Sequence, residues 1–356
     1  MCLNNKCPIT VVTVFLGSGK TTLLANILHN KEFRNTVVII NEYGQAGLDH
    51  RLIRRIEERT RLLSGGCICC NKREDLVKEL KDLLTAYENK EIEMDRVVIE
   101  TTGLADPAPI LFSILMDPLL THHFFVDFVI SCLDAVNGEL HLRANPESVK
   151  QIVASDKIII TKMDLVEQET VDVLCAQVRM LNPAGQIITA ANGNIDPETV
   201  FKSRDCFSEA KFSNTISNFS PKAIRHNEKV SSMSIRFYKP LDWTAFGLWM
   251  SMLLYAHGEN MLRIKGIVDV GADGPVVING VQHIIHPPQH LESWNGEERN
   301  SHIVFIMKDI AAEKVLKSLK VFQHLLGAEP EIEELNATPF GEKKNYNIIL
   351  KAGKVA

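Results

Sequence analysis

The sequence predicts a two-domain α/β protein, with a doubly wound, mostly parallel sheet in the first domain and a smaller α+β second domain. A length of 356 residues exceeds the usual size of one hydrophobic core. Between residues 8 and 189, short β-branched runs alternate with longer amphipathic segments, the pattern of a parallel sheet covered by helices. The content of 45% apolar and 23% charged residues is that of an ordinary globular protein.

Short apolar runs mark the strands of the first domain. A helix is predicted over Asn71–Tyr87, where leucines recur at helical spacing behind an asparagine that can cap the first turn. Six runs are expected to form the parallel sheet: Thr10–Phe15, Thr36–Asn41, Arg96–Thr101, Phe125–Leu133, Lys157–Thr161 and Gln186–Thr189.

A polar stretch separates the two predicted domains. Residues 194–228 are rich in Ser, Asn and Lys and lack periodicity, which indicates a linker. We therefore expect domains at 8–193 and 229–327, and a polar peripheral tail at 328–356 in which Tyr346–Leu350 is a candidate strand. The second domain is expected to contain strands at Ser231–Phe237, Leu262–Val270, Val276–Ile285 and His302–Met307, and helices at Asp242–Tyr255 and Ala311–Leu325.

Charge and hydropathy exclude several classes of partner. The net charge of −5 is small and both signs are scattered, so we expect neither nucleic acid nor a membrane as a partner. No apolar run approaches the ~18 residues of a membrane span, and no leader precedes the first strand, so a cytoplasmic location is expected. Eight cysteines are too few for a disulfide scaffold in a chain of this length.

A glycine-rich loop, Leu16–Thr22 (LGSGKTT), follows the first predicted strand and precedes a helical pattern. Glycines let backbone N–H groups close around phosphate oxygens, and the helix N-terminus adds the positive end of its dipole. The Lys20 ammonium is expected to neutralise the β- and γ-phosphates, and the Thr21 hydroxyl to bind magnesium. The loop predicts a P-loop NTPase, with a chance glycine turn as the alternative; the expected nucleotide-binding residues are Gly17, Ser18, Gly19, Lys20, Thr21 and Thr22.

Val14 stands where the strict P-loop pattern has its first glycine. A β-branched residue resists positive φ. Either the entry to the loop is therefore regular strand, or nucleotide affinity is weakened. Gly17 and Gly19, which lie closest to the phosphates, are retained.

Two further strand ends carry groups expected at a GTP site. Glu100 follows a buried strand, where P-loop proteins place the carboxylate that organises magnesium or water; an ordinary strand end is the alternative. Thr161-Lys162-Met163-Asp164 is close to the N-K-x-D motif of GTPases, with Thr161 in place of asparagine. The Asp164 carboxylate can accept hydrogen bonds from guanine N1–H and the exocyclic amino group, a pairing that adenine lacks. GTP is therefore preferred over ATP, with a charged helix cap as the alternative.

Three cysteines, Cys67, Cys69 and Cys70, fall within four residues directly after Gly65-Gly66. The helix that is predicted to start near Asn71 lowers their thiol pKa values through its dipole, and thiolates bind soft or borderline metals. Adjacent residues do not all reach one ion, so two or three sulfurs and an incomplete shell are expected, which suits metal transfer. Cysteines packed as small hydrophobes, or a redox pair, are the alternatives.

These motifs together resemble the CobW family of P-loop GTPases, which are relatives of the nickel chaperones UreG and HypB and share the C-x-C-C motif. The first domain carries the resemblance in Leu16–Thr22, Asn41–Gly44, Gly65–Cys70, Glu100–Pro107 and Thr161–Asp164. The second resembles the CobW C-terminal domain in Glu259–Gly266, Gly280–His283 and Ser301–Phe305.

The resemblance implies a GTPase metallochaperone with coupled nucleotide and metal sites. Carried over to this chain, Lys20 and Thr21 hold phosphate and magnesium, and Glu100 sits at the catalytic magnesium and water. Glu42 lies in a switch segment near the metal site. The implied ligands are GTP, magnesium and a transition metal, with zinc expected first and cobalt or iron as alternatives. A client metalloprotein is the expected partner, and a homodimer is an open alternative.

The mechanistic hypothesis is that GTP and magnesium order residues 42–49 and bring a carboxylate toward the cysteine loop, and that hydrolysis releases it. One alternative is a non-hydrolysing regulatory module that binds nucleotide weakly, which Val14 favours. Others are an activator that inserts cobalt or iron into a client such as nitrile hydratase or the cobalamin pathway, and an ATP-dependent small-molecule kinase.

Two groups of histidines were considered as further metal ligands. His283, His286 and His290 are candidates for a secondary patch, although solvated loop residues are the preferred interpretation. His122 and His123 are interpreted as a helix end rather than a ligand pair.

Overall fold

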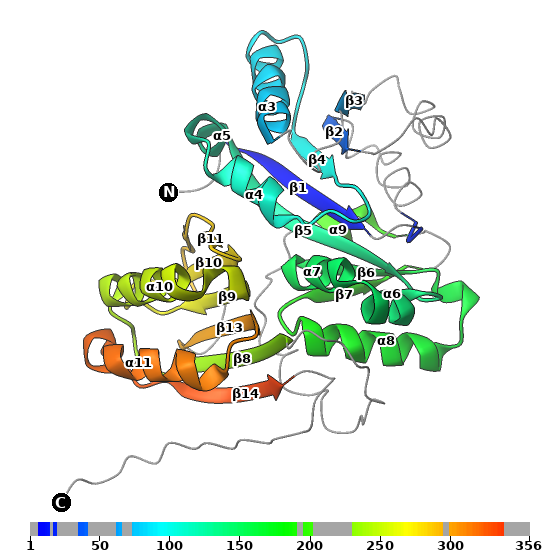
Figure 1. Cartoon of the computed structure of the whole chain (residues 1–356). Helices are drawn as coiled ribbons and strands as arrows, with labels where there is room; N and C mark the ends of the chain where they lie inside the picture. The colour runs from blue at the N-terminus through cyan, green and yellow to red at the C-terminus, as the bar shows by residue number, and fades with distance from the viewer. Residues whose placement is uncertain are drawn as a thin grey trace, which may run out of the picture. The chain divides into compact units, whose positions relative to one another are not determined.

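The computed structural model describes residues 6–14, 17–19, 35–41, 62–65, 73–190, 195–201, 230–294 and 299–337. The chain folds as two compact units (Figure 1). Within the described ranges, no helix is long and apolar enough to cross a membrane.

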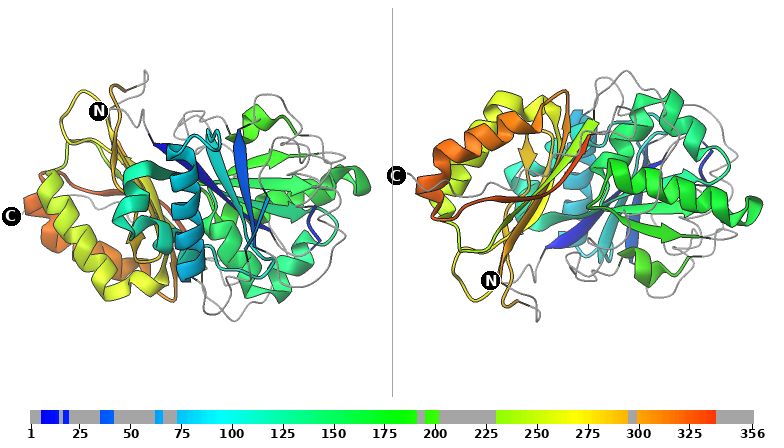
Figure 2. Two further views of the ribbon diagram at one scale, coloured as in Figure 1. Left: turned by 90° about the horizontal axis from the view of Figure 1, so that it is seen from above. Right: turned by 90° about the horizontal axis from the view of Figure 1, so that it is seen from below.

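The first unit is built on a parallel sheet of seven strands (Figures 1 and 2). The six predicted strands are confirmed to within a few residues, and one further strand, β3, had not been predicted. The strand order is β3-β2-β4-β1-β5-β6-β7. The bounds are β1 Cys7–Val14, β2 Thr36–Asn41, β3 Leu62–Gly65, β4 Arg96–Glu100, β5 Phe124–Asp134, β6 Lys157–Thr161 and β7 Gln186–Thr189.

From β3 onward, each crossover steps in the same direction along the sheet. Right-handed crossovers therefore place the intervening helices on one face. The predicted helix at 71–87 is confirmed as α3, whose four leucines at positions 76, 80, 83 and 84 are all buried. The helices are α3 Arg73–Glu88, α4 Ala108–Leu115, α5 Pro118–His123, α6 Gly138–Ala144, α7 Pro146–Ala154, α8 Gln168–Leu181 and α9 Pro197–Phe201.

The second unit is an antiparallel sheet covered by two helices, as the predicted α+β class requires (Figure 1). The strand order is β11-β10-β9-β13-β8-β14, and β12 also pairs with β10. The helices are α10 Trp243–His257 and α11 Ala312–Leu326. The strands are β8 Val230–Phe237, β9 Met261–Val268, β10 Val276–Val281, β11 Ile284–Ile285, β12 Gln289–His290, β13 Ser301–Lys308 and β14 Glu331–Ala337.

Two predictions for this unit were wrong in detail. Val276–Ile285 is not one strand but a hairpin, β10 and β11, because the chain turns at Gln282 with a positive φ of 55°. The stretch after residue 327 was expected to be peripheral, yet its residues 331–337 form β14 and pair with β8. A polar edge strand lacks the hydrophobic alternation by which the other strands were recognised.

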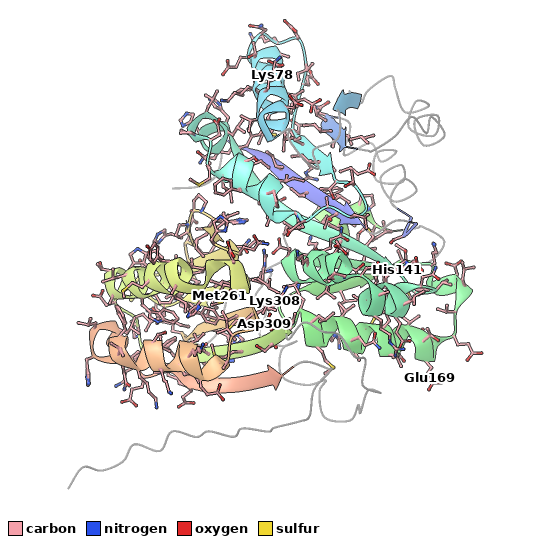
Figure 3. The ribbon with its side chains drawn as sticks, viewed as in Figure 1. Lys78, His141, Glu169, Met261, Lys308 and Asp309 are labelled. Atoms are coloured by element: carbon pink, nitrogen blue, oxygen red, sulfur yellow. The ribbon has the colours of Figure 1, made fainter. Side chains whose placement is uncertain are left out.

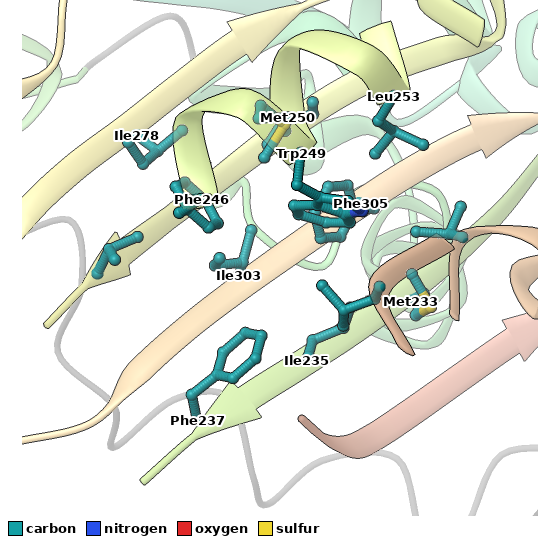
Figure 4. Packing of buried hydrophobic residues seen from close by; sticks show 14 of the residues in the cluster. Met233, Ile235, Phe237, Phe246, Trp249, Met250, Leu253, Ile278, Ile303 and Phe305 are labelled. Carbon is teal, nitrogen blue, oxygen red and sulfur yellow. The ribbon is translucent and has the colours of Figure 1, made fainter. Parts of the chain in front are cut away.

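The core of the second unit lies between the sheet and the two helices (Figure 4). Trp249 of α10 stands edge-on to Phe305 of β13, with ring centroids 6.0 Å apart, and its Nε1–H donates to Ser318 Oγ of α11 at 3.1 Å. At the carboxyl end of β13, the Asn260 side chain donates to the Lys308 carbonyl oxygen. Lys308 is followed by Asp309, which has a positive φ of 55° and precedes α11 (Figure 3).

A buried lysine and a half-buried arginine connect α9 to the amino ends of two parallel strands. The Lys157 ammonium donates to the carbonyl oxygens of Thr199 at 3.3 Å and Val200 at 2.8 Å. The Arg96 guanidinium lies 4.5 Å from the ring centroid of Phe201. These contacts satisfy charges that would be costly to bury alone.

The pair Gly266 and Gly247 tests how closely the second sheet is packed. A Cβ at Gly266 would lie 2.4 Å from the His302 carbonyl oxygen, so Gly266→Ala should destabilise this unit by about 2–3 kcal/mol. At Gly247, within α10, a Cβ meets nothing within 4 Å, so Gly247→Ala should stabilise it by about 0.5–1 kcal/mol. Urea denaturation followed by tryptophan fluorescence measures both, since all three tryptophans belong to this unit. Equal effects would contradict the packing account.

The partly buried carboxyl of Asp127 on β5 predicts a pH dependence for the first unit. Burial raises the pKa of Asp127 from 3.8 to about 6, against the opposing charges of Arg96 and Lys157. Because the folded state then binds more protons, its stability should fall by up to about 3 kcal/mol as pH rises from about 4 to 6. Asp127→Asn should flatten this fall in thermal unfolding followed by circular dichroism. Exposed Asp82→Asn is the matched control and should behave as wild type.

Candidate functional site

The phosphate loop begins where β1 ends. Val14 is the last residue of β1 and pairs with Cys132 of β5, so the interpretation of Val14 as regular strand is confirmed. Gly17 and Gly19 have φ of 81° and 87°, in the left-handed region that favours glycine. Ser18 between them is buried. The two glycines are thus required by the turn of the loop itself.

The predicted guanine motif contacts this loop directly. The Thr161 hydroxyl donates to the Ser18 carbonyl oxygen at 2.9 Å, and the bond is buried. The Lys162 ammonium donates to the Gly17 carbonyl oxygen at 2.7 Å. Two motifs more than 140 residues apart in sequence therefore form one site, and Thr161 still supplies a hydrogen-bond donor where GTPases have asparagine.

A residue that was not predicted, Asp134, supports Lys162. Lys162 has a positive φ of 56°, and its ammonium lies 3.6 Å from the carboxylate of Asp134. Asp134 is the last residue of β5, pairs with Thr161, and accepts a hydrogen bond from the Asn137 N–H at 2.6 Å. Its side chain is 1% exposed. Glu100 was predicted because a carboxylate follows a buried apolar run, and the same pattern in the sequence could have identified Asp134.

Glu100 and Asp164 lie at the same carboxyl edge of the sheet. Glu100 ends β4, is 4% exposed, and pairs with Val12 of β1, the strand that leads into the phosphate loop. The next residue continues the pairing, since the Thr101 N–H donates to the Val12 carbonyl at 2.9 Å. Asp164 lies in the 3₁₀ turn Met163–Leu165 that follows Lys162, and it is exposed.

The remaining predicted site residues lie outside the described part of the chain: Lys20, Thr21, Thr22, Glu42, Cys67, Cys69 and Cys70. Their roles stay predictions. The strands that precede two of these segments are described, however. β2 and β3 end side by side, with Asn41 paired to Gly65.

The candidate histidines lie in different surroundings. Among the described residues, no three His, Cys, Asp or Glu side chains gather in a way that could hold a metal ion, and that set includes His283, His286 and His290. His286 is buried rather than solvated. His122 and His123 form the last turn of α5, as expected of a helix end.

The Thr161 hydrogen bond predicts a measurable change in nucleotide binding. Thr161→Val keeps the shape of the side chain but removes the buried hydrogen bond to the Ser18 carbonyl that joins the loop to β6, so affinity for nucleotide should fall about 5- to 10-fold. Thr189→Val, at an exposed position on β7, is the matched control. Titration with a fluorescent guanine nucleotide would measure both. A Thr161→Val affinity within twofold of wild type would show that the contact does not shape the loop.

Comparison with known proteins agrees with this geometry. The chain is 30% identical over 312 residues to a protein of Escherichia coli (strain K12) named zinc chaperone YjiA, over 87% of this chain and 97% of that protein. It is 29% identical over 214 residues to a protein of Schizosaccharomyces pombe named zinc-regulated GTPase metalloprotein activator 1, over 58% of this chain and 51% of that protein.

A crystal structure described as Zn(II)-bound YjiA GTPase from E. coli superposes with a TM-score of 0.64 at 27% identity, over 89% of this chain and 99% of that one. The family model described as "CobW/HypB/UreG, nucleotide-binding domain" matches residues 8–189. The model "Cobalamin synthesis protein cobW C-terminal domain" matches residues 230–323. The motifs, the fold and these matches agree: the chain belongs to the CobW/HypB/UreG family.

Proposed function

We propose that this protein is a zinc chaperone that hydrolyses GTP and uses the nucleotide to control how tightly it holds zinc. The observation that carries the proposal is the direct contact between the T-K-M-D motif and the phosphate loop. The names of the relatives, zinc chaperone and zinc-regulated GTPase, support the choice of nucleotide and of metal.

The T-K-M-D turn would bind the guanine base, and the adjacent phosphate loop would bind the triphosphate. Asp164 is exposed, and its carboxylate would accept hydrogen bonds from the guanine N1–H and amino group. Lys162 and Thr161 fix the position of that turn relative to the loop through Gly17 and Ser18. A base and its phosphates would then be held at a set distance.

Hydrolysis requires a water molecule to attack the γ-phosphorus while the bond to the β-phosphate oxygen breaks, giving GDP and phosphate. Lys20 would neutralise the phosphate charge, and Glu100 would orient the water. Magnesium, when bound with GTP, would further stabilise that charge. The Glu100 carboxylate, next to β1, is a hard oxygen donor that suits magnesium. The Thr21 hydroxyl would be the second protein ligand of the ion.

Zinc is the cargo in this proposal, held by thiolates of Cys67, Cys69 and Cys70 with Glu42 as an oxygen donor. The pairing of Asn41 with Gly65 supports this choice of ligands. Glu42 directly follows Asn41, and Cys67 comes two residues after Gly65, so both start from neighbouring strand ends. The GTP-bound state would order residues 42–49 and close the shell, and hydrolysis would reopen it.

Coupling demands that zinc affinity differ between nucleotide states, since a ligand bound equally by both shifts nothing. Zinc affinity, measured by competition with a chelating dye, should be at least about tenfold tighter with GTP or a non-hydrolysable analogue than with GDP. Equal affinities in all three states would exclude the coupling.

Two sets of variants make this experiment specific. Serine at each of Cys67, Cys69 and Cys70 should weaken zinc binding. Cys7→Ser should not, because burial raises the pKa of Cys7 to about 12 and keeps it a thiol. Lys20→Ala should abolish GTP turnover. Turnover that survives it would exclude the phosphate loop as the catalytic site, and a wild type without turnover would favour the regulatory module.

A further inference from the structure

Gln151 of α7 contacts the segment that follows Glu100, and neither the sequence motifs nor the family resemblance pointed to it. This segment, Thr101–Pro107, connects β4 to α4. The Gln151 amide nitrogen lies 3.2 Å from the Gly103 carbonyl oxygen and 3.0 Å from the Ala105 carbonyl oxygen. One side-chain amide thus donates to two carbonyl oxygens of the same segment.

The contact is built into the fold rather than made at the surface. Gln151 is 2% exposed, on the buried side of α7, and a buried amide without partners is costly. Its neighbour Lys150 adds a weaker ion pair, 3.9 Å from the Asp106 carboxylate, whose other oxygen accepts the Ala108 N–H that starts α4. Helix α7 therefore holds the segment at several points.

Fixing these carbonyls also fixes the amides that follow them. A trans peptide is planar, so a carbonyl turned toward α7 turns the next N–H the opposite way. Gln151 therefore sets the direction of the Leu104 and Asp106 N–H groups. At its other end the segment is held by the Thr101 N–H bond to Val12 of the phosphate-loop strand.

We propose that Gln151 is a positioning residue for GTP hydrolysis, which holds the segment after Glu100 in the arrangement that the reaction needs. The inference rests on the proposed GTPase function. The Gln151 amide donates to Gly103 and Ala105 and not to the described residues of the phosphate loop, 17–19. Its loss should therefore lower kcat and leave the KM for GTP nearly unchanged.

The test is Gln151→Met, which matches the side chain in length and removes both donors. The kcat for GTP should fall about tenfold, with KM within about twofold, because small misplacements of a reacting group have large kinetic effects. Gln177→Met, at a buried glutamine on α8, is the matched control and should keep wild-type kcat. Unchanged kcat in Gln151→Met, a change confined to KM, or an equal loss in the control would overturn the proposal.

Hydrogen exchange separates this inference from the proposed function. The amides of Thr101 and Ala105 are hydrogen-bonded in the folded chain, so a peptide covering residues 101–107 should exchange faster in Gln151→Met. If wild type shows no Lys20-dependent turnover, the GTPase proposal fails. If residues 101–107 exchange at the wild-type rate in Gln151→Met, Gln151 does not hold this segment in place. Should Gln151→Met not fold, Gln151→Asn keeps the amide but shortens its reach, and the same kcat and exchange outcomes apply.

Discussion

The candidate site depends on two side chains that donate to backbone carbonyls of the phosphate loop. The hydroxyl of Thr161 and the ammonium of Lys162 reach Ser18 and Gly17 from the end of β6, past β5, the one strand that lies between β6 and β1 in the sheet. These bonds join the loop to the end of β6 and so stabilise its conformation before any nucleotide binds. Parallel pairing positions the other site residues, because it brings the carboxyl ends of β1, β4, β5 and β6 to the same edge of the sheet.

Much of this arrangement could be predicted from local sequence signals. Buried parallel strands are long β-branched runs, and Ile158-Ile159-Ile160 in β6 is a clear case, with all three side chains fully buried. The glycine loop and the T-K-M-D turn were recognisable because their chemistry requires particular residues at fixed spacing. Glu100 was predicted by the same reasoning.

What was missed lacked such a local signal, or carried one that was not used. β3 has only four residues, two of them Ser64 and Gly65, and is recognised as a strand through its pairing with β2. β14 is a polar edge strand. Gln151 belongs to no motif, and its role depends on carbonyls 46 and 48 residues away in sequence. Asp134, by contrast, followed an apolar run as Glu100 does.

The two cations that contact α9, Lys157 and Arg96, set a lower limit on how far the first unit can be shortened. Lys157 is 1% exposed and finds its acceptors in Thr199 and Val200, beyond the last strand of the parallel sheet. A fragment that stopped at β7 would retain the ammonium but lose both carbonyls, and Arg96 would lose the aromatic ring beside it. An independently folding nucleotide-binding unit therefore has to extend through Phe201, past the residues that carry any of its motifs.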